Sequence, residues 1–394
     1  MIEELTETKP QINLENNTLI KRFKKQRIQT FDLARGFAIF FMIIQHVVLI
    51  YGNLEVNSSI IGLVLLSLGT IPAAPVFLFL MGVCYKYSEK DDNELFQYGF
   101  KRGLKLIFSG YCLNLCRFSI PLLIGLDKLE LNLYEINESI HLTPFSSFFI
   151  VDILQCAGLS LIMMAVIVQF FKKELDYILI SVGVLLISPF LWGRMTTIVL
   201  FNFCLNLLWG TGSDVFFPIF PWLVYPLVGM ALGQRLRSGM EIEYLISISR
   251  NIGIGLFITS IIIALRNMGR GIFVIGTIIN LIDPLFRFNG SEHHGPIAIL
   301  LIIGFLLVWM WICHLLVKKI PQNPLYSILF YSSENVTAIY IIQWMIVGWG
   351  IFLFGFQTQD LFITLFLICF IIVLTHLFVY FYAKLKAFIL ISCQ

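Results

Sequence analysis

The sequence predicts an all-α integral membrane protein that crosses the bilayer about ten times. Of its 394 residues, 58% are hydrophobic and only 13% are charged, and the mean hydropathy is +0.87. A soluble chain of this length cannot bury so much apolar surface. Long apolar runs alternate with short polar segments along the chain. We therefore expect a helical bundle with about ten spans and one or two re-entrant or interfacial segments.

Charge predicts how the chain enters the membrane. Residues 1–30 are polar, turn basic just before the first apolar run and contain no apolar core of a cleaved signal peptide. By the positive-inside rule this segment is a cytoplasmic tail, followed by a transmembrane domain over 31–386 and a short tail over 387–394. Both termini are expected in the cytoplasm, and the plasma membrane is the expected location.

Two classes of partner are excluded by charge and spacing. The formal net charge is only +3, and the basic residues lie in short clusters beside apolar runs, which excludes nucleic acid as a partner. The eight cysteines show neither metal-ligand spacing nor a disulfide framework. His293 and His294 follow Glu292, but adjacent histidines rarely bind the same ion and no third ligand is spaced for it. No metal is therefore expected.

Ten apolar runs are expected to span the membrane. They are 31–51, 60–86, 103–125, 146–171, 176–192, 217–234, 251–265, 296–317, 335–356 and 361–383. The loops between the early runs are alternately basic and acidic, as successive crossings require. The run 196–209 is about 14 residues long and contains Asn202 and Asn206, so it is expected to be re-entrant or interfacial.

One section does not follow the charge rule. Residues 266–295, around a short apolar run at 271–282, carry several arginines although this topology places them on the far side of the membrane. Arginines in a long loop can escape the rule. Alternatively, Arg266 and Arg270 bind an anionic or sugar-like substrate.

The first span carries three ionisable residues, Asp32 and Arg35 near its start and His46 near its end. Arg35 and His46 are 11 residues apart, which on a helix is a difference of about 20° around the axis and roughly 16 Å along it. They share one face. An ionisable side chain in a span costs roughly 2.5 kcal/mol or more unless it faces protein or a water-filled cavity. This face is expected to look inward.

Polar residues in the next spans are expected at the depth of His46. Asn114 and Arg117 lie in the third span, and Asp152 and Gln155 lie in the fourth. Asp152 could hold one imidazole tautomer and raise its basicity, while Arg117 could neutralise Asp152 or stabilise a developing oxyanion. The alternative is a buried structural ion pair between Arg117 and Asp152 that only locks helices together.

The cytoplasmic end of the first span has two interpretations. Asp32 and Arg35 are three residues apart, so an ordinary ion pair along the helix explains both. The functional interpretation is that Arg35, with Lys101, Arg102 and Lys105 before the third span, forms a basic mouth that binds phosphate groups.

The first span resembles a known motif. Arg35, ten intervening residues and His46, within D-x-x-R-G-x-A, resemble the first-helix motif of the transmembrane acyltransferases, which include the acyltransferase-three proteins and the heparan-α-glucosaminide N-acetyltransferase-like proteins. Further stretches are similar to the second group and occur in its order: PVFLFLMG at 75–82, RGLKLIFSGYCLN at 102–114, DILQCAGLSL at 152–161, FPIFPWLVYPLVGMALGQ at 217–234 and ENVTAIYII at 334–342.

The resemblance implies a membrane enzyme that takes an acyl group, usually acetyl, from cytoplasmic acyl-CoA. It delivers this group to a hydroxyl or amine of a sugar or glycan-like acceptor across the membrane. His46 then matches the catalytic histidine of the family and Arg35 its partner. The segment matching TAIYIIQ often ends in histidine in the family, but here it ends in Gln343.

These observations combine into one hypothesis. His46, Asp152 and Arg117 form the catalytic group, with His46 acting as a general base or becoming transiently acetylated. Asn114 and Gln155, with the two loop arginines named above, contact the acceptor, and acetyl-CoA is the co-substrate without a metal. The competing hypothesis is a transporter or flippase in which the buried charges line a permeation path. The identity of the acceptor and the oligomeric state stay open.

Overall fold

The computed structural model describes residues 27–88, 90–124, 143–210, 215–267 and 295–392. Within these residues the chain forms helices and two isolated β-bridges, and no strand. Nine helical segments among the described residues are long and apolar enough to cross a membrane. The predicted fold class, an all-α polytopic membrane protein, is therefore confirmed.

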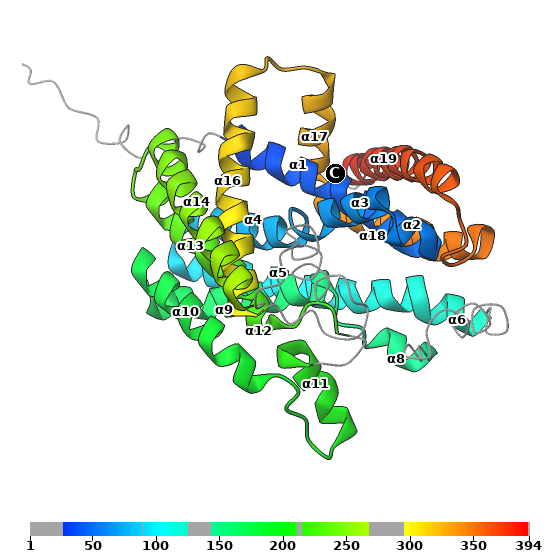
Figure 1. Cartoon of the computed structure of the whole chain (residues 1–394), viewed down its shortest axis with the longest axis horizontal. Helices are drawn as coiled ribbons and strands as arrows, with labels where there is room; N and C mark the ends of the chain where they lie inside the picture. The colour runs from blue at the N-terminus through cyan, green and yellow to red at the C-terminus, as the bar shows by residue number, and fades with distance from the viewer. Residues whose placement is uncertain (1–26, 89, 125–142, 211–214, 268–294, 393–394) are drawn as a thin grey trace, which may run out of the picture.

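Figure 1 shows the described helices, coloured from blue to red along the chain. In chain order they are α1 (Gln29–Tyr51), α2 (Leu54–Ser58), α3 (Ile60–Thr70), α4 (Ala74–Tyr87), α5 (Asp92–Asn114), the π-helix η2 (Leu115–Ser119), α6 (Ile120–Ile124), α8 (Pro144–Phe148), α9 (Ile153–Phe170), α10 (Glu174–Leu191), α11 (Val199–Trp209), α12 (Ile219–Trp222), α13 (Val224–Arg237), α14 (Ile242–Asn267), α16 (Pro296–Lys319), α17 (Pro324–Glu334), α18 (Val336–Phe354) and α19 (Leu361–Ser392).

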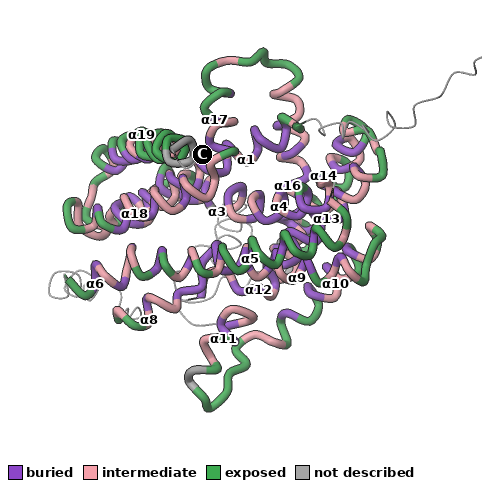
Figure 2. The backbone as a smooth tube through the Cα atoms, turned by 180° about the vertical axis from the view of Figure 1, so that it is seen from behind, coloured by how far each residue is buried: buried purple, intermediate pink, exposed green. Residues whose placement is uncertain are grey.

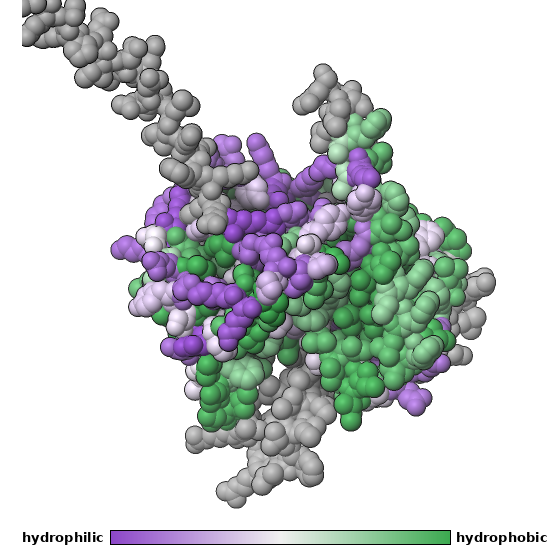
Figure 3. All heavy atoms as spheres, turned by 90° about the horizontal axis from the view of Figure 1, so that it is seen from above, coloured by the Kyte–Doolittle hydropathy of each residue, from purple (hydrophilic) through white to green (hydrophobic). Residues whose placement is uncertain are grey.

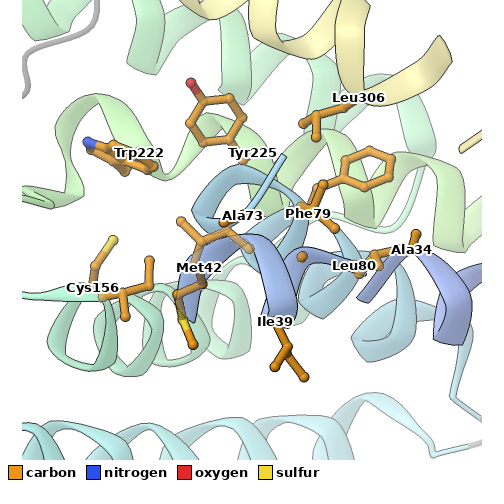
Figure 4. Close-up of a cluster of buried hydrophobic side chains, with 14 of the residues drawn as sticks. Ala34, Ile39, Met42, Ala73, Phe79, Leu80, Cys156, Trp222, Tyr225 and Leu306 are labelled. Atoms are coloured by element: carbon orange, nitrogen blue, oxygen red, sulfur yellow. The ribbon is translucent and has the colours of Figure 1, made fainter. Parts of the chain in front are cut away.

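Helix α1 is the centre of the packing. It contacts α3, α4, α16, α17, α18 and α19, and most of its length is buried (Figure 2). Ala34 and Ile39 of α1 lie in the same buried cluster as Phe79 of α4 and Leu306 of α16 (Figure 4). Because α1 is enclosed by its neighbours, its polar side chains must face protein or an internal space. The expectation that the face of Arg35 and His46 looks inward agrees with this packing.

Two helix pairs approach closely where small residues meet. A Cβ added to Gly103 of α5 would lie 2.5 Å from the carbonyl oxygen of Gly158 on α9. Gly253 of α14 and Gly304 of α16 face each other in the same way, since a Cβ added to either would lie 2.8 Å from the carbonyl oxygen of the other. Such contacts between small residues are a main source of helix association in membranes, where lipid removes the hydrophobic driving force. They hold α5 against α9 and α14 against α16.

Ion pairs join helix ends that the charge pattern assigns to one side of the membrane. The pairs are Arg27 with Glu334, Lys86 with Asp92 at 3.4 Å, Lys172 with Asp92 at 2.5 Å, Arg235 with Glu174 at 2.5 Å, and Lys318 with Glu243 at 2.6 Å. In Figure 3 hydrophilic residues gather on one part of the surface and hydrophobic residues cover a broad adjoining flank. The helix directions inside the molecule thus agree with the alternation predicted from the loops.

Two spans begin elsewhere than the apolar runs indicate. The third helix starts at Asp92 rather than near residue 103, because Asp91 caps it and Glu94 closes a capping box with the Asp91 backbone. The fourth starts at Ile153 rather than 146, because Asp152 caps α9 in the same manner with Gln155. Hydropathy alone does not locate either cap, because Asp91 lies before the third apolar run and Asp152 lies inside the fourth.

Other boundaries differ less. The run 217–234 forms α12 and α13 with a break between them, and α13 packs along α4 but is shorter than the described spans. Helix α11 has only 11 residues, too few to span, as expected for 196–209. The last helix, α19, continues to Ser392, beyond the predicted end near 383. The N-terminal tail before residue 27 and the apolar run 271–282 lie outside the described residues.

The contact between α5 and α9 gives a test of the fold. In Gly158→Ala the new methyl group would lie 2.6 Å from the carbonyl oxygen of Gly103, so we expect the free energy of unfolding to fall by about 1–3 kcal/mol. The matched control is Gly183→Ala on α10, where nothing lies within 4 Å of the added Cβ. The control should leave stability unchanged or raise it slightly. Thermal unfolding in detergent measures both, and equal stability of the two variants would contradict this packing.

Candidate active site

His46 is held by helix α18. Its Nδ1 lies 3.0 Å from Oε1 of Gln343, and its ring lies 4.1 Å from the ring of Trp344. Because an amide oxygen can only accept a hydrogen bond, this contact places the proton on Nδ1 and leaves the lone pair on Nε2. The side chain is half-buried rather than enclosed. Nε2 is therefore available as a base or nucleophile.

One face of α18 carries three residues that lie near His46. Tyr340, Gln343 and Trp344 are spaced i, i+3 and i+4, so they project from the same side of the helix. The ring of Tyr340 lies 6.4 Å from the ring of His46. Its hydroxyl donates to Oδ2 of Asp152 at 2.6 Å. Helix α18 thus connects the imidazole to the buried carboxylate.

Asp152 is a fully bonded buried carboxylate. Its Oδ2 accepts from Nη2 of Arg117 at 2.5 Å as well as from Tyr340, and its Oδ1 accepts from the backbone N–H of Ile153 at 2.7 Å. Only 6% of the residue is exposed. A buried charge is tolerated when it is paired and hydrogen-bonded in this way. Among the described residues Asp152 makes no direct hydrogen bond to His46, so Gln343 takes the place expected for the carboxylate.

Arg117 lies in the π-helix η2, where the continuous helix that began as α5 widens by one residue. Such bulges are frequent at functional sites because they re-aim a side chain. The guanidinium carbon lies 4.3 Å from the ring centre of Trp344 and 4.4 Å from that of Phe118. Only 2% of Arg117 is exposed. Cation–π contacts of this kind stabilise a guanidinium that is removed from water.

Asn114 and Gln155 hydrogen-bond to Arg117 and Asp152, respectively. The Asn114 amide donates to the carbonyl oxygens of Phe148 at 3.0 Å and Ile150 at 2.7 Å, and its oxygen accepts from Arg117 at 3.0 Å. Gln155 donates to the Ile150 carbonyl at 3.3 Å and accepts from the Asp152 backbone N–H at 3.3 Å. Both amides thus fix the bend before α9. Acceptor binding by either residue stays a prediction.

A pocket of about 290 Å³ lies at the start of α1. Its lining residues are Arg27, Ile28, Phe31, Asp32, Arg35, Cys84, Tyr87 and Ser88. Within the part of the chain that the structure describes, Arg35 makes only long contacts, to Ser333 Oγ at 3.4 Å, Cys84 Sγ at 3.2 Å and Asp32 at 3.9 Å. Its guanidinium therefore keeps donor capacity toward the pocket.

Arg27 differs from Arg35 because two carboxylates engage it. It donates to Asp32 and to Glu334, and the hydrogen bond to Asp32 raises the pKa of Arg27 above its usual value. The ordinary ion pair of Asp32 with Arg35 is the longer of the two contacts that Asp32 makes with arginine. Of the two arginines in this pocket, Arg35 is the one with the weaker internal bonds.

The remaining predicted residues lie apart from this pocket or outside the description. Lys101, Arg102 and Lys105 are exposed on α5 and are not among the residues that line the pocket. Arg266 is described only as part of the helix α14, and Arg270 lies outside the described residues. The structure therefore brings together His46, Asp152, Arg117, Asn114 and Gln155, and it leaves the three α5 cations on a separate surface.

Tyr340, Gln343 and Trp344 of α18 were not predicted from the sequence as site residues. The signal that could have found them is the spacing of Tyr340, Gln343 and Trp344, which puts two hydrogen-bonding groups and an indole on one face of an otherwise apolar span. A polar residue in a span needs a partner, and His46 was the nearest candidate at matching depth.

Fold and site together define a polytopic membrane protein with a buried polar centre around a histidine. Residues 27–261, more than half of the chain, match the family model described as heparan-alpha-glucosaminide N-acetyltransferase, catalytic, and the chain belongs to this family. No match was found among curated proteins. The family identifies the chain as a membrane acetyltransferase. Helix α18 lies beyond the matched residues.

The buried ion pair gives a second prediction. Asp152→Asn leaves the Arg117 guanidinium without its counterion in a site that excludes water, so we expect a loss of roughly 3–5 kcal/mol in stability. Removing the charge from both residues, in Asp152→Asn combined with Arg117→Met, should restore part of that loss. Glu55→Gln, at an exposed carboxylate, is the control and should unfold like the wild type. A single variant as stable as this control would contradict the pairing.

Proposed function

We propose that this membrane acetyltransferase takes its acetyl group from cytoplasmic acetyl-CoA and transfers it to a hydroxyl or amine of a sugar-like acceptor on the other side of the membrane. The observation that carries the proposal is the state of His46. A half-buried imidazole inside a helical bundle is bonded through Nδ1 to Gln343, which leaves Nε2 as a base. A merely structural histidine would use both ring nitrogens in the packing.

The donor would enter from the pocket that Arg35 lines. A phosphate of CoA could replace the long contacts of the Arg35 guanidinium with charge-assisted hydrogen bonds. The pantetheine arm would then follow α1 toward His46. The separation of the two residues along the helix is roughly 16 Å, which is comparable to the reach of that arm. This match supports one binding mode from the pocket to the imidazole.

At the reaction centre His46 would remove the proton of the acceptor hydroxyl or amine as it attacks the thioester. The same nitrogen is equally suited to attack the thioester itself and form an acetyl-histidine. In both routes the proton on Nδ1 stays with the hydrogen bond to Gln343. Gln343 is thus proposed to fix the tautomer and the orientation of the ring, which is the role first expected of Asp152.

Asp152 and Arg117 would act on this centre as an electrostatic pair. Asp152 reaches α18 through the hydroxyl of Tyr340, and Arg117 reaches it through the ring of Trp344. The pair brings a guanidinium close to the histidine without leaving an isolated charge in the bilayer. We place Asn114 and Gln155 as the supports of this pair, and Arg266 and Arg270 as candidate contacts of the acceptor.

The proposed orientation follows from the donor. The helix ends joined by ion pairs, including Arg27 with Glu334, would face the cytoplasm, where CoA is available. Both termini would then lie in the cytoplasm, and the protein would reside in the plasma membrane with its acceptor outside.

The catalytic assignment can be tested with His46→Ala. Because the variant lacks the imidazole that takes the proton, we expect transfer from labelled acetyl-CoA to fall by at least about 10²-fold while the protein keeps its thermal stability. His376→Gln is the matched control, since His376 bonds Ser332 and the Ile372 carbonyl away from this centre. Wild-type transfer by His46→Ala would overturn the assignment.

The donor site can be tested with Arg35→Ala. Loss of a charge-assisted hydrogen bond to phosphate should raise KM for acetyl-CoA by about tenfold and change kcat little. The comparison is a variant in which Lys101, Arg102 and Lys105 are all changed to alanine. Because these cations are exposed and screened by salt, their removal should raise KM by less than about threefold. The opposite order of the two effects would move the phosphate site from the pocket to the surface of α5.

A further inference from the structure

Four buried nitrogen atoms beside His46 have no hydrogen-bond acceptor among the described residues. One is Nε1 of Trp344, and the other three are Nε and Nη1 of Arg117 and Nε2 of Gln343. Arg117 and Gln343 are at least 98% buried, so water at the surface cannot satisfy their donors. In each residue the other polar atoms are engaged, Nη2 of Arg117 by Asp152 and Oε1 of Gln343 by His46. The open donors therefore belong to otherwise well-bonded side chains.

Open donors in such a place are unusual. A buried donor without an acceptor costs about 1–3 kcal/mol, and more when it is charged, so proteins leave few of them. These donors also share one neighbour, the indole of Trp344. Gln343 precedes it in the chain, the Arg117 guanidinium carbon lies 4.3 Å from its ring centre, and the His46 ring lies 4.1 Å away. The site is preorganised to donate hydrogen bonds to an oxygen atom placed beside His46.

The charge of the site limits what that ligand can be. Asp152 already neutralises Arg117, so a second carboxylate would leave a net negative charge buried in the bilayer. A neutral carbonyl oxygen that becomes negative only during the reaction avoids this cost, because the donors are strongest when the charge develops. The acyl group of the donor is the reacting carbonyl next to His46.

We infer that Arg117 and Gln343 bind the carbonyl oxygen of the donor thioester and stabilise the oxyanion that forms on it. This inference rests on the proposed function. Gln343 thereby serves two partners at once, accepting from Nδ1 of His46 through its oxygen and donating to the acyl oxygen through its nitrogen. Of the two roles that the sequence left open for Arg117 beyond a structural pair, this one uses the atoms that Asp152 leaves free.

In direct transfer, the acceptor oxygen or nitrogen forms a bond to the carbonyl carbon while its proton moves to Nε2 of His46. The π electrons of the carbonyl move to the oxygen between Arg117 and Gln343. When the carbonyl re-forms, the bond from carbon to sulfur breaks, and the CoA thiolate leaves and takes the proton from His46. If His46 is acetylated first, the same oxygen carries the charge.

The variant Gln343→Glu separates the two functions of the glutamine. Glutamate keeps the shape and an oxygen that accepts from Nδ1 of His46, but it lacks the N–H donor. If Gln343 only orients the histidine, transfer should be unchanged or faster, as with a carboxylate partner. If it also holds the oxyanion, kcat should fall by about 10²-fold. Gln97→Glu, at an exposed position of α5, is the matched control and should keep wild-type kcat.

A binding measurement on the wild-type protein tests the same point without a variant. Acetyl-CoA and S-ethyl-CoA differ at the acyl end, where only the first has a carbonyl oxygen. We expect acetyl-CoA to bind about threefold to tenfold more tightly, as one or two additional hydrogen bonds allow. Titration calorimetry in detergent measures both ligands. The difference should disappear in Gln343→Glu.

The outcomes distinguish this inference from the proposed function. Wild-type kcat in Gln343→Glu, or equal affinity of the wild type for the two ligands, would overturn the carbonyl site and leave the acetyltransferase assignment intact. A wild-type protein that neither binds nor uses acetyl-CoA would overturn the proposed donor together with this inference. A fall in kcat with loss of the affinity difference would establish the carbonyl site.

Discussion

The buried ion pair between Arg117 and Asp152 is the interaction on which the site depends. It joins η2 to the start of α9, and the hydroxyl of Tyr340 ties the same carboxylate to α18. An unpaired charge at this depth would cost several kcal/mol, so neither residue is tolerable without the other. In the proposed mechanism the pair would do more than lock helices together. It would allow a guanidinium to lie near a half-buried histidine while the local charge stays balanced.

Helices α1 and α18 divide the chemistry between them. Helix α1 supplies the imidazole and, about three turns earlier, the arginine of the pocket. Helix α18 supplies the hydrogen bond that sets the tautomer and the indole against which the ring packs. Because α1 is packed on most sides, its two functional residues cannot move independently. The distance between pocket and histidine is thus a fixed property of one helix, which suits a donor with a long flexible arm.

The sequence predicted much of this arrangement. Hydropathy gave the class and nearly all the spans, and helical spacing put Arg35 and His46 on one inward face. Depth matching grouped Asn114, Arg117, Asp152 and Gln155, which the structure brings together. The sequence could not predict that Asp152 is a cap rather than a mid-span residue, or that Gln343 is the partner of His46, because both depend on tertiary contacts. The phosphate-binding role of Lys101, Arg102 and Lys105 stays a prediction, because the structure shows only that they are exposed on α5 and do not line the pocket.

In the proposed mechanism a thioester reaches His46 from the pocket at the start of α1. A cryo-electron microscopy structure with a stable carbonyl analogue of acetyl-CoA, in which a methylene group separates sulfur from the carbonyl, would show this binding mode. We expect phosphate density at Arg35 and the carbonyl carbon roughly 3–5 Å from the His46 ring, with its oxygen toward Arg117 and Gln343. Density that ends far from His46, or that enters the bundle without contacting Arg35, would rule out this path of the donor.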